Sequence, residues 1–210
     1  MTTTMVRDTV AESDTKQRIL RAARERLLAD GFAALSTRKI ADAAGVPLSQ
    51  VHYHLGTREE MVLSMLGEEN DRLLERQAAL FSEATSLSEQ WAIACDYLDD
   101  DLASGYVRIL QEMTAAGWSS DVIGERLREM MAGWAGVLAD VARRAQREGI
   151  DLGGLTADEV AALTSALFIG AESLILTGME RDGLPLRTAL RKLGGLIGLV
   201  EAGTRTWDAG

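Results

Sequence analysis

Proline occurs at only two of the 210 positions, Pro47 and Pro185, and this scarcity constrains the fold strongly. Proline removes a backbone donor and breaks the interior of a helix, so a chain with so few prolines can form long helices. Ala, Leu, Arg, Glu and Met are abundant, whereas runs of β-branched residues are short, and both facts favour helices over strands. We therefore predict an all-α fold.

Apolar residues recur at helical spacing, and glycines and capping residues divide the chain into about nine expected helices. The first four are expected at about 14–30, 37–44, 48–55 and 57–80. The others are expected at about 87–103, 106–116, 121–148, 156–180 and 185–202. Three pairs have the spacing of a capping box: Thr57 with Glu60, Ser86 with Glu89, and Thr156 with Glu159.

The same sequence disfavours several classes of protein. Cys95 is the only cysteine, so the chain cannot form an intrachain disulfide or a zinc site built from several cysteines. No run of about 18 apolar residues occurs, and the N-terminal residues lack the apolar core of a signal peptide. These observations predict a cytoplasmic protein with no membrane partner. Phosphate-binding, dinucleotide-binding and nucleophile motifs are also missing, so we expect no cofactor and no enzymatic activity.

Residues 36–58, STRKIADAAGVPLSQVHYHLGTR, carry the most informative pattern. The two short helices expected at 37–44 and 48–55 are joined by a tight turn at Gly45, which is the arrangement of a helix-turn-helix. In that arrangement the first helix crosses the DNA backbone and the second enters the major groove. This segment therefore predicts binding to double-stranded DNA.

The second of these helices has a narrow apolar stripe, Leu48, Val51 and Leu55, and its other positions are polar. Gln50 can donate a hydrogen bond to a base edge and accept one from it at the same time. Hydroxyl groups and cations near the start of a helix are suited to binding phosphate oxygens. The residues that we expect to contact DNA are Thr37, Arg38, Lys39, Pro47, Leu48, Ser49, Gln50, His52, Tyr53, His54, Thr57 and Arg58.

His52 and His54 are the only two histidines, and a pair so close together suggests a metal site. On a helix, however, residues i and i+2 point about 200° apart, so they cannot bind one ion together. We therefore expect no metal site and assign both histidines to the DNA contact.

The stretch from about Lys16 to Leu66 resembles the DNA-binding region of TetR-type transcriptional regulators. The matching residues are Ser36, Ile40-Ala41, Ala44-Gly45-Val46, Val51 to Leu55 and Thr57 to Met61. The resemblance implies a DNA-binding domain at 13–60 and a helical ligand-binding and dimerisation domain at 61–205. Three residues depart from the usual pattern: Pro47 replaces a capping serine, His52 a tyrosine and Arg58 a lysine.

The resemblance also implies two further partners. A homodimer formed through the last two helices would space its reading helices about 34–36 Å apart, as a palindromic operator requires. A small-molecule effector of unknown identity would release a repressor from that operator. Aromatic and methionine side chains suit an adaptable apolar pocket. The residues that we expect to contact the effector are Tyr106, Met113, Trp118, Met130, Trp134, Phe168 and Glu172.

The net charge of −10 would disfavour a nucleic-acid partner if it were spread evenly. Residues 15–58, however, hold eight Lys and Arg against three Asp and Glu, so this segment carries +5 and the remainder −15. This segregation predicts salt-sensitive DNA binding through one face. A helical enzyme and a helical adaptor without DNA binding are the alternatives, and both leave the polar second helix unexplained.

Overall fold

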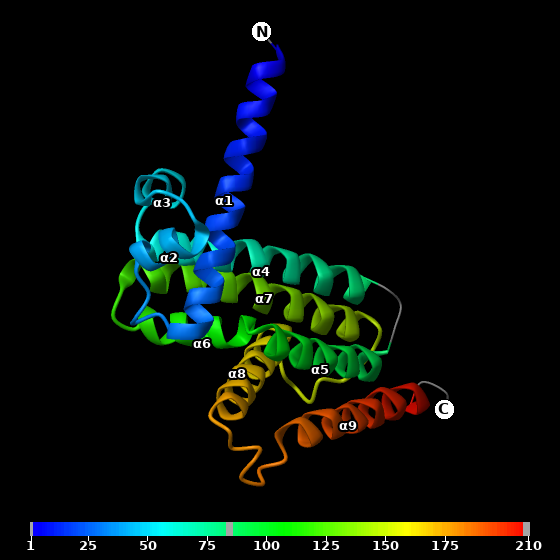
Figure 1. Cartoon of the computed structure of the whole chain (residues 1–210). Helices are drawn as coiled ribbons and strands as arrows, with labels where there is room; N and C mark the ends of the chain where they lie inside the picture. The colour runs from blue at the N-terminus through cyan, green and yellow to red at the C-terminus, as the bar shows by residue number, and fades with distance from the viewer. Residues whose placement is uncertain (1, 83–85, 208–210) are drawn as a thin grey trace. The chain divides into compact units, whose positions relative to one another are not determined.

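The computed structural model describes the backbone of residues 2–82 and 86–207, and the side chains of residues 13–79 and 86–203. Over these ranges the chain forms nine α-helices and no strand, which confirms the predicted all-α class (Figure 1). The helices are α1 (Thr2–Asp30), α2 (Thr37–Ala44), α3 (Leu48–Leu55), α4 (Arg58–Ser82), α5 (Leu87–Ser104), α6 (Tyr106–Gly117), α7 (Asp121–Arg147), α8 (Ala157–Leu176) and α9 (Leu186–Trp207).

Local sequence signals account for most helix ends. The three predicted capping boxes are confirmed by reciprocal hydrogen bonds at the starts of α4, α5 and α8. Three ends differ from the prediction, and one of them is the end of α9, which lies at Trp207 rather than near residue 202. α1 begins at Thr2 rather than near Asp14, because no glycine or proline interrupts the preceding residues. α8 ends at Leu176 rather than near Glu180, because Gly178 has a φ of +86° and turns the chain out of the helix.

The chain divides into two compact units, and α4, α6 and α7 contribute residues to both. Unit 1 comprises Met1–Asn70 and Arg108–Leu127, and unit 2 comprises Asp71–Val107 and Arg128–Gly210. This division follows packing, whereas the boundary expected near residue 60 concerns function and stays a prediction.

Unit 1 has a core of branched and sulfur-containing side chains. α1 and α2 pack against each other and against α3. Ile19, Ile40, Met61, Leu66 and Ile109 are among the fully buried side chains of this unit. Burial of such side chains is worth about 1.5–3 kcal/mol each, so the short helices α2 and α3 depend on this packing for their stability.

Unit 2 is organised around α5, which lies along α9 (Figure 1). Gly194 permits this approach, because a side-chain carbon there would lie 3.1 Å from the Trp91 ring. The Trp91 indole N–H donates to Leu190 O at 2.7 Å. At the other end of the pair, the buried Glu201 carboxylate accepts the Leu87 backbone N–H at 2.5 Å and thereby caps α5.

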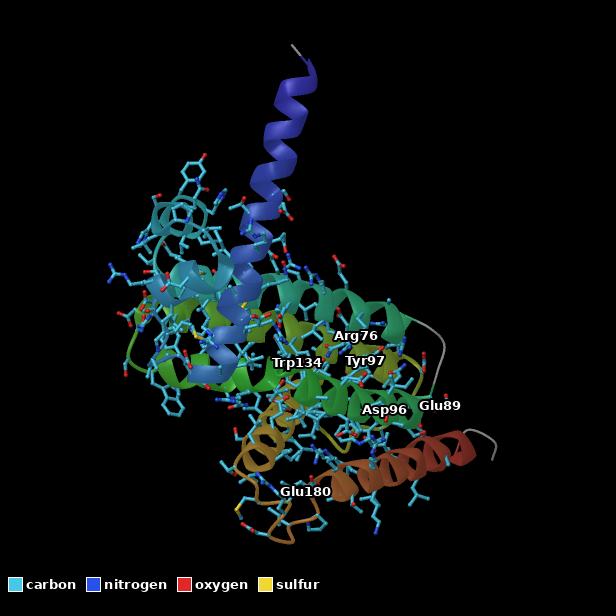
Figure 2. The ribbon with its side chains drawn as sticks, viewed as in Figure 1. Arg76, Glu89, Asp96, Tyr97, Trp134 and Glu180 are labelled. Atoms are coloured by element: carbon cyan, nitrogen blue, oxygen red, sulfur yellow. The ribbon has the colours of Figure 1, made fainter. Side chains whose placement is uncertain are left out.

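Charged side chains join further helices within unit 2. The Arg76 guanidinium of α4 lies 3.8 Å above the Tyr97 ring, and these two residues lie together in Figure 2. Arg76 also donates to both carboxylate oxygens of Asp101 at 3.2 Å. At the start of α9, Arg187 forms ion pairs with Asp99 of α5 and with Glu180 of the loop after α8. Arg187 therefore links this loop to α9 and to α5.

α8 is the one helix, over the ranges described, that could cross a membrane by length and composition, and 17% of that stretch is buried. The sequence prediction excluded a spanning helix because no run of about 18 apolar residues was found, whereas α8 meets the criterion of length and mean hydropathy. The exposed face that results is described below.

Candidate nucleic-acid interface

The turn between α2 and α3 is built from local hydrogen bonds. Ser36 caps α2 by accepting the Lys39 backbone N–H at 3.3 Å. Gly45 ends the helix in the left-handed region, with φ 64° and ψ 40°, where other residues would be strained. The Val46 N–H then donates back to Ala41 O at 3.1 Å. These bonds set the direction in which the chain enters α3.

Arg18 of α1 holds the same turn from outside. Its Nη2 atom donates to Ala44 O at 2.7 Å and to Gly45 O at 3.3 Å, at the end of α2 where backbone carbonyls lack helical partners. A cation is also favoured there by the helix dipole. Sequence reasoning counted Arg18 only as part of the basic charge, because nothing in the sequence distinguishes it from its neighbours Arg21 and Arg24.

α3 is held in the unit by one narrow apolar stripe, as predicted. Val51 is fully buried and Leu55 is 6% exposed, whereas Leu48 at the helix start is 36% exposed. Pro47 occupies the N-cap position and no side chain caps the helix, which confirms the expected loss of the serine cap. Two buried side chains therefore carry most of the packing of this helix.

The side of α3 opposite the stripe is polar and exposed. Ser49, Gln50 and Tyr53 lie within about 100° of arc at 3.6 residues per turn, and Tyr53 is 72% exposed. Because this arc faces away from Val51 and Leu55, its side chains are the part of α3 that a DNA groove could receive.

The two histidines flank this arc and form hydrogen bonds along the helix. His52 Nδ1 lies 3.2 Å from Gly56 O, and His54 Nε2 lies 3.1 Å from Gln50 Oε1. Carbonyl oxygens only accept hydrogen bonds, so each of these ring nitrogens must carry a proton. No group of three or more His, Cys, Asp or Glu within the described part of the chain is arranged to hold a metal ion.

The predicted phosphate-binding cations differ in how freely they project. Arg38 is exposed, and its guanidinium forms no ion pair with any described residue. Lys39 is also exposed, but its Nζ atom donates to Ala34 O at 3.1 Å and lies 3.5 Å from Asp30. Thr37, in the first turn of α2, is half-buried. Arg38 is therefore the cation with the most freedom to meet a phosphate.

Arg58, at the start of α4, is engaged inside unit 1. Its Nη1 atom donates to Leu35 O at 3.3 Å, and its guanidinium lies 4.5 Å above the Phe32 ring. Its Nη2 atom donates to Glu59 at 2.7 Å, and this hydrogen bond is the main reason that the pKa of Glu59 lies below its usual range. Thr57 beside it is exposed and caps α4 through Glu60.

Glu112 of α6 contacts the same turn between α1 and α2. One carboxylate oxygen accepts the Phe32 backbone N–H at 2.6 Å, and the other accepts from Arg108 at 3.3 Å. The first bond stabilises the chain where Gly31 leaves α1 with a φ of +77°. No local signal in the sequence identifies Phe32 as the partner of Glu112, because the two residues are 80 positions apart.

The residues expected to contact the effector are divided between the two units. Tyr106, Met130, Trp134, Phe168 and Glu172 belong to unit 2, and Met113 and Trp118 belong to unit 1. In unit 2 the rings of Trp134 and Phe168 pack edge to face with centroids 6.1 Å apart, and Trp134 is labelled in Figure 2. In unit 1 Met113 is fully buried, whereas Trp118 is 83% exposed. The structure brings only part of the predicted set together.

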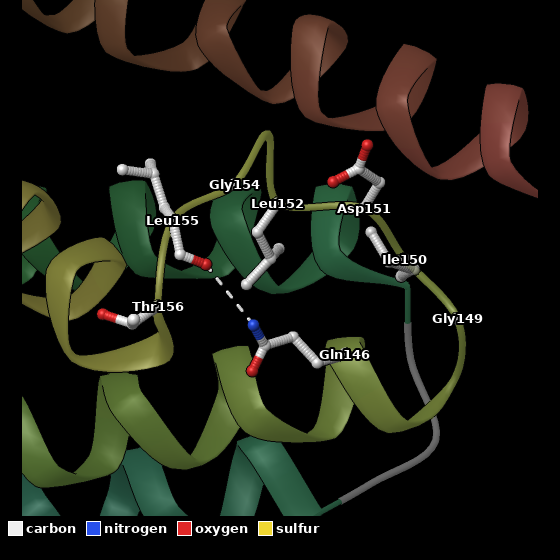
Figure 3. A pocket seen from close by; sticks show the side chains of 8 residues that line it. All are labelled: Gln146, Gly149, Ile150, Asp151, Leu152, Gly154, Leu155 and Thr156. Carbon is white, nitrogen blue, oxygen red and sulfur yellow. Dashed lines mark hydrogen bonds between the residues drawn. The ribbon is translucent and has the colours of Figure 1, made fainter.

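A surface pocket of about 450 Å³ lies at the loop between α7 and α8 (Figure 3). It is lined by Gln146, Gly149, Ile150, Asp151, Leu152, Gly154, Leu155 and Thr156. The Gln146 amide spans it and donates to Leu155 O at 3.4 Å. None of the predicted effector residues lines this pocket, and no motif in the sequence distinguishes its loop.

α8 and α9 each present an exposed apolar face in unit 2. On α8 this face carries Leu163, Leu167 and Leu174, which recur at helical spacing. On α9 it carries Leu196, which is 60% exposed, and Leu199, which is 69% exposed. Exposed leucines in such rows are uncommon on the surface of a monomer.

The model for bacterial regulatory proteins of the tetR family matches residues 19–65, which span the end of α1, the helix-turn-helix and the start of α4. Residues 19–65 are therefore a DNA-binding region of the TetR family of transcriptional regulators. This confirms the resemblance, and with it the DNA-binding function of the regulator. A regulator of this family is not expected to be an enzyme.

Solved structures share the fold of the regulator over most of both chains. GusR of Salmonella enterica has a TM-score of 0.73 and 20% identity, covering 88% of this chain and 95% of its own. FadR of Bacillus subtilis, in complex with stearoyl-CoA, has a TM-score of 0.70 and 16% identity, covering 85% and 96%. A regulator from Saccharomonospora viridis, in complex with choline, has a TM-score of 0.71 and 19% identity, covering 87% and 94%.

At these sequence identities the structural similarity shows the fold only. The stearoyl-CoA and the choline are ligands of those neighbours and are not assigned to this chain by the similarity. No protein with a curated description matches the regulator by sequence.

Proposed function

We propose that this regulator is a repressor that binds a palindromic operator as a homodimer and leaves it when a small-molecule effector binds. The observation that carries the DNA half of the proposal is α3, a short helix buried along one stripe and polar and exposed on the other side. The exposed polar side chains of such a helix contribute little to the stability of the fold. In a major groove the same side chains can form hydrogen bonds with the edges of the bases.

The DNA contacts that we propose fall into two groups. Ser49, Gln50 and Tyr53 face the bases, because they form the exposed arc of α3. The other predicted residues would meet phosphates or the flanks of the groove. They are Thr37, Arg38, Lys39, Pro47, Leu48, His52, His54, Thr57 and Arg58. Arg58 would contribute in addition by holding the turn beside α2.

We propose that the homodimer forms through α8 and α9. The exposed leucines of both helices support this assignment, because a second copy would remove them from water. A two-fold interface would also pair two α3 helices with the two halves of a palindrome. The same contact would cover the apolar face of α8 without a membrane, in keeping with the cytoplasmic location that we propose.

We propose that the effector binds among side chains of unit 2, with Trp134 and Phe168 as apolar contacts and Glu172 as a polar one. The edge-to-face aromatic cluster supports an apolar contact surface, and two neighbours of the same fold hold small molecules in their structures. Tyr106, Met113, Trp118 and Met130 remain predictions. The effector would act by binding better to a form whose α3 helices are wrongly spaced for the operator.

This mechanism assigns DNA binding to residues 13–60, and effector binding and dimerisation to residues 61–205. The charge distribution supports the division, since the basic excess lies in residues 15–58. DNA phosphates would attract the first part and repel the second, which limits non-specific binding.

The proposal is tested by titrating the full chain against labelled duplexes from the DNA upstream of its own gene, using fluorescence anisotropy at several salt concentrations. We expect sequence-dependent binding that weakens steeply with salt. The double variant Gln50→Ala, Tyr53→Ala should lower the affinity about a hundredfold, because it removes two base contacts. Circular dichroism and light scattering should remain unchanged. A chain that shows no salt-sensitive, sequence-dependent binding contradicts the proposal.

A further inference from the structure

The His52 ring has one nitrogen engaged by the fold and a second that remains for a partner. Nδ1 lies 3.2 Å from Gly56 O, and a carbonyl oxygen only accepts, so Nδ1 carries a proton. In a neutral imidazole the other nitrogen, Nε2, then holds a lone pair and can only accept. His52 is exposed, so a partner outside the unit can reach its ring.

The place of His52 on α3 directs it toward the wall of a groove. His52 lies about 60° beyond Ser49, at one edge of the exposed arc that Ser49, Gln50 and Tyr53 form. A helix in the major groove turns its outer face to the bases and its flanks to the two sugar-phosphate strands. Under the proposed function His52 therefore meets a phosphate, whose oxygens only accept hydrogen bonds.

The surroundings of His52 favour a protonated ring. The residue lies in the last turn of α3, where the carbonyl end of the helix dipole attracts a cation. At the start of α4 the Glu60 carboxylate lies against Gly56, the residue to which His52 bonds. Hydrogen bonds from the Thr57 backbone and side chain hold the pKa of Glu60 below its usual range, so this carboxylate stays ionised near neutral pH.

The helices packed against α3 carry the other charged groups of this region. Arg18 of α1 is held at the end of α2, where it donates to two backbone carbonyls. The charged residues of α2 are Arg38, Lys39 and Asp42, and all three are exposed. Within the described part of the chain none of these groups forms an ion pair with His52, so its charge is left to be set by an outside partner.

We propose that His52 binds an operator phosphate as an imidazolium, so that operator binding takes up one proton. The proposal rests on the proposed function, in which α3 enters the major groove. The proton comes from solvent and joins the Nε2 lone pair, while Nδ1 keeps its hydrogen bond to Gly56. The other neutral tautomer would also place a proton on Nε2, but it would lose the bond to Gly56 and bring no charge to the phosphate.

Proton uptake makes the operator affinity depend on pH in a definite direction. Histidine changes charge between about pH 5 and pH 8, and a nearby phosphate stabilises its charged form. The bound state then holds more protons than the free state, so the affinity rises as the pH falls, by at most about tenfold per pH unit. His54 is the natural comparison, because it is half-buried and its Nε2 atom already donates to Gln50.

The experiment measures the fluorescence anisotropy of the upstream duplex that the full chain binds most tightly, at constant ionic strength, between about pH 6 and pH 8. The dissociation constant should rise about tenfold over this range for the wild type. It should change less than about twofold for His52→Gln, because the glutamine amide donates at every pH. His54→Gln is the matched control and should keep the wild-type dependence on pH. Calorimetry in two buffers of different ionisation enthalpy should show proton uptake by the wild type that His52→Gln lacks.

The possible results separate this proposal from the function on which it rests. A wild type that binds no duplex in a sequence-dependent way would overturn the proposed function and this proposal with it. Specific binding whose affinity does not change with pH, or weakens as the pH falls, would overturn the role of His52 alone. The same conclusion would follow if His52→Gln kept the dependence on pH or if His54→Gln lost it.

Discussion

The helix pairs α2–α3 and α8–α9 each leave one face uncovered within their own unit, but the exposed side chains differ in kind. α3 exposes Ser49, Gln50 and Tyr53, whose polar groups are well solvated by water when no partner is bound. α8 and α9 expose rows of leucines, among them Leu196 and Leu199, which water solvates at a cost. The first face is compatible with water, whereas exposure of the second face to water is unfavourable.

This contrast separates conditional from permanent association. A repressor must leave its operator, so a polar face that is stable in water suits it. The homodimer that we propose would have to persist on and off the DNA, and an apolar interface would serve that purpose. The predictions that follow test the two faces separately.

The largest effect is expected from the double variant Leu196→Glu, Leu199→Glu on α9. Each buried leucine is worth about 1.5–3 kcal/mol, and two-fold symmetry doubles the loss. The dimer dissociation constant should rise at least about a thousandfold, and operator affinity should fall with it. Sedimentation equilibrium measures the first quantity and anisotropy the second.

Val122→Glu is the matched control for this variant, because Val122 of α7 is 64% exposed but lies in unit 1. This variant, like the wild type, should remain a dimer at micromolar concentration. A wild type that sediments as a monomer, or a double variant that remains a dimer, would contradict the proposal that the exposed leucines of α9 form a dimer interface.

An intermediate effect is expected from Arg18→Ala, which removes the hydrogen bonds to Ala44 O and Gly45 O. A hydrogen bond from a charged donor contributes about 1.5–3 kcal/mol, and partial exposure of this one lowers the expected loss to about 1–2 kcal/mol. Urea unfolding measures the loss. Arg21→Ala removes the same charge from an exposed position of α1 and should stay within about 0.5 kcal/mol of the wild type. Equal losses in the two variants would contradict the role assigned to Arg18.

The smallest effect is expected from Thr156→Ala at the N-cap of α8. The Thr156 backbone and hydroxyl donate to Glu159 and hold the pKa of that carboxyl below its usual value of 4.5. A lowered carboxyl pKa stabilises the fold above about pH 4.5, and this contribution is lost as the pH falls through the lowered pKa. The variant should therefore raise the pKa of Glu159 and reduce the acid sensitivity of the midpoint of thermal unfolding. Carbon NMR titration of the side-chain carboxyls measures the pKa directly.

Ser86→Ala provides the comparison for this prediction, because it removes the equivalent cap of α5. It should raise the pKa of Glu89, which the Ser86 backbone and hydroxyl lower, and leave that of Glu159 unchanged. A common shift of both carboxyls in either variant would show that the caps do not act locally.

Features specified within a few residues could be predicted from the sequence. The bounds of α2 and α3 follow from Ser36, Gly45 and Gly56, and the capping boxes follow from pairs three residues apart. The family motif lies in the same short stretch, and its match confirms the helix-turn-helix.

Roles that depend on distant partners could not be predicted in this way. Arg18 bonds to a residue 26 positions away, and Glu112 bonds to a residue 80 positions away. Arg58 has the charge expected of a phosphate contact, yet its guanidinium is turned toward Phe32 and Leu35 by packing that no local pattern encodes. The hydrogen bond between His54 and Gln50 was within reach of spacing rules, but the sequence alone offered several partners for each side chain.

The cap that Glu201 places on α5 has a consequence for the order of folding. Glu201 and Leu87 are 114 residues apart, so the first turn of α5 is completed only when nearly the whole chain is present. The bond between Arg18 and Ala44 closes a loop of 26 residues, and short loops close at a smaller entropic cost and more rapidly. During synthesis from the N-terminus, α1–α3 can therefore assemble while α9 is still being made. The nascent chain therefore acquires α2 and α3 before it acquires the face through which we propose that two copies pair.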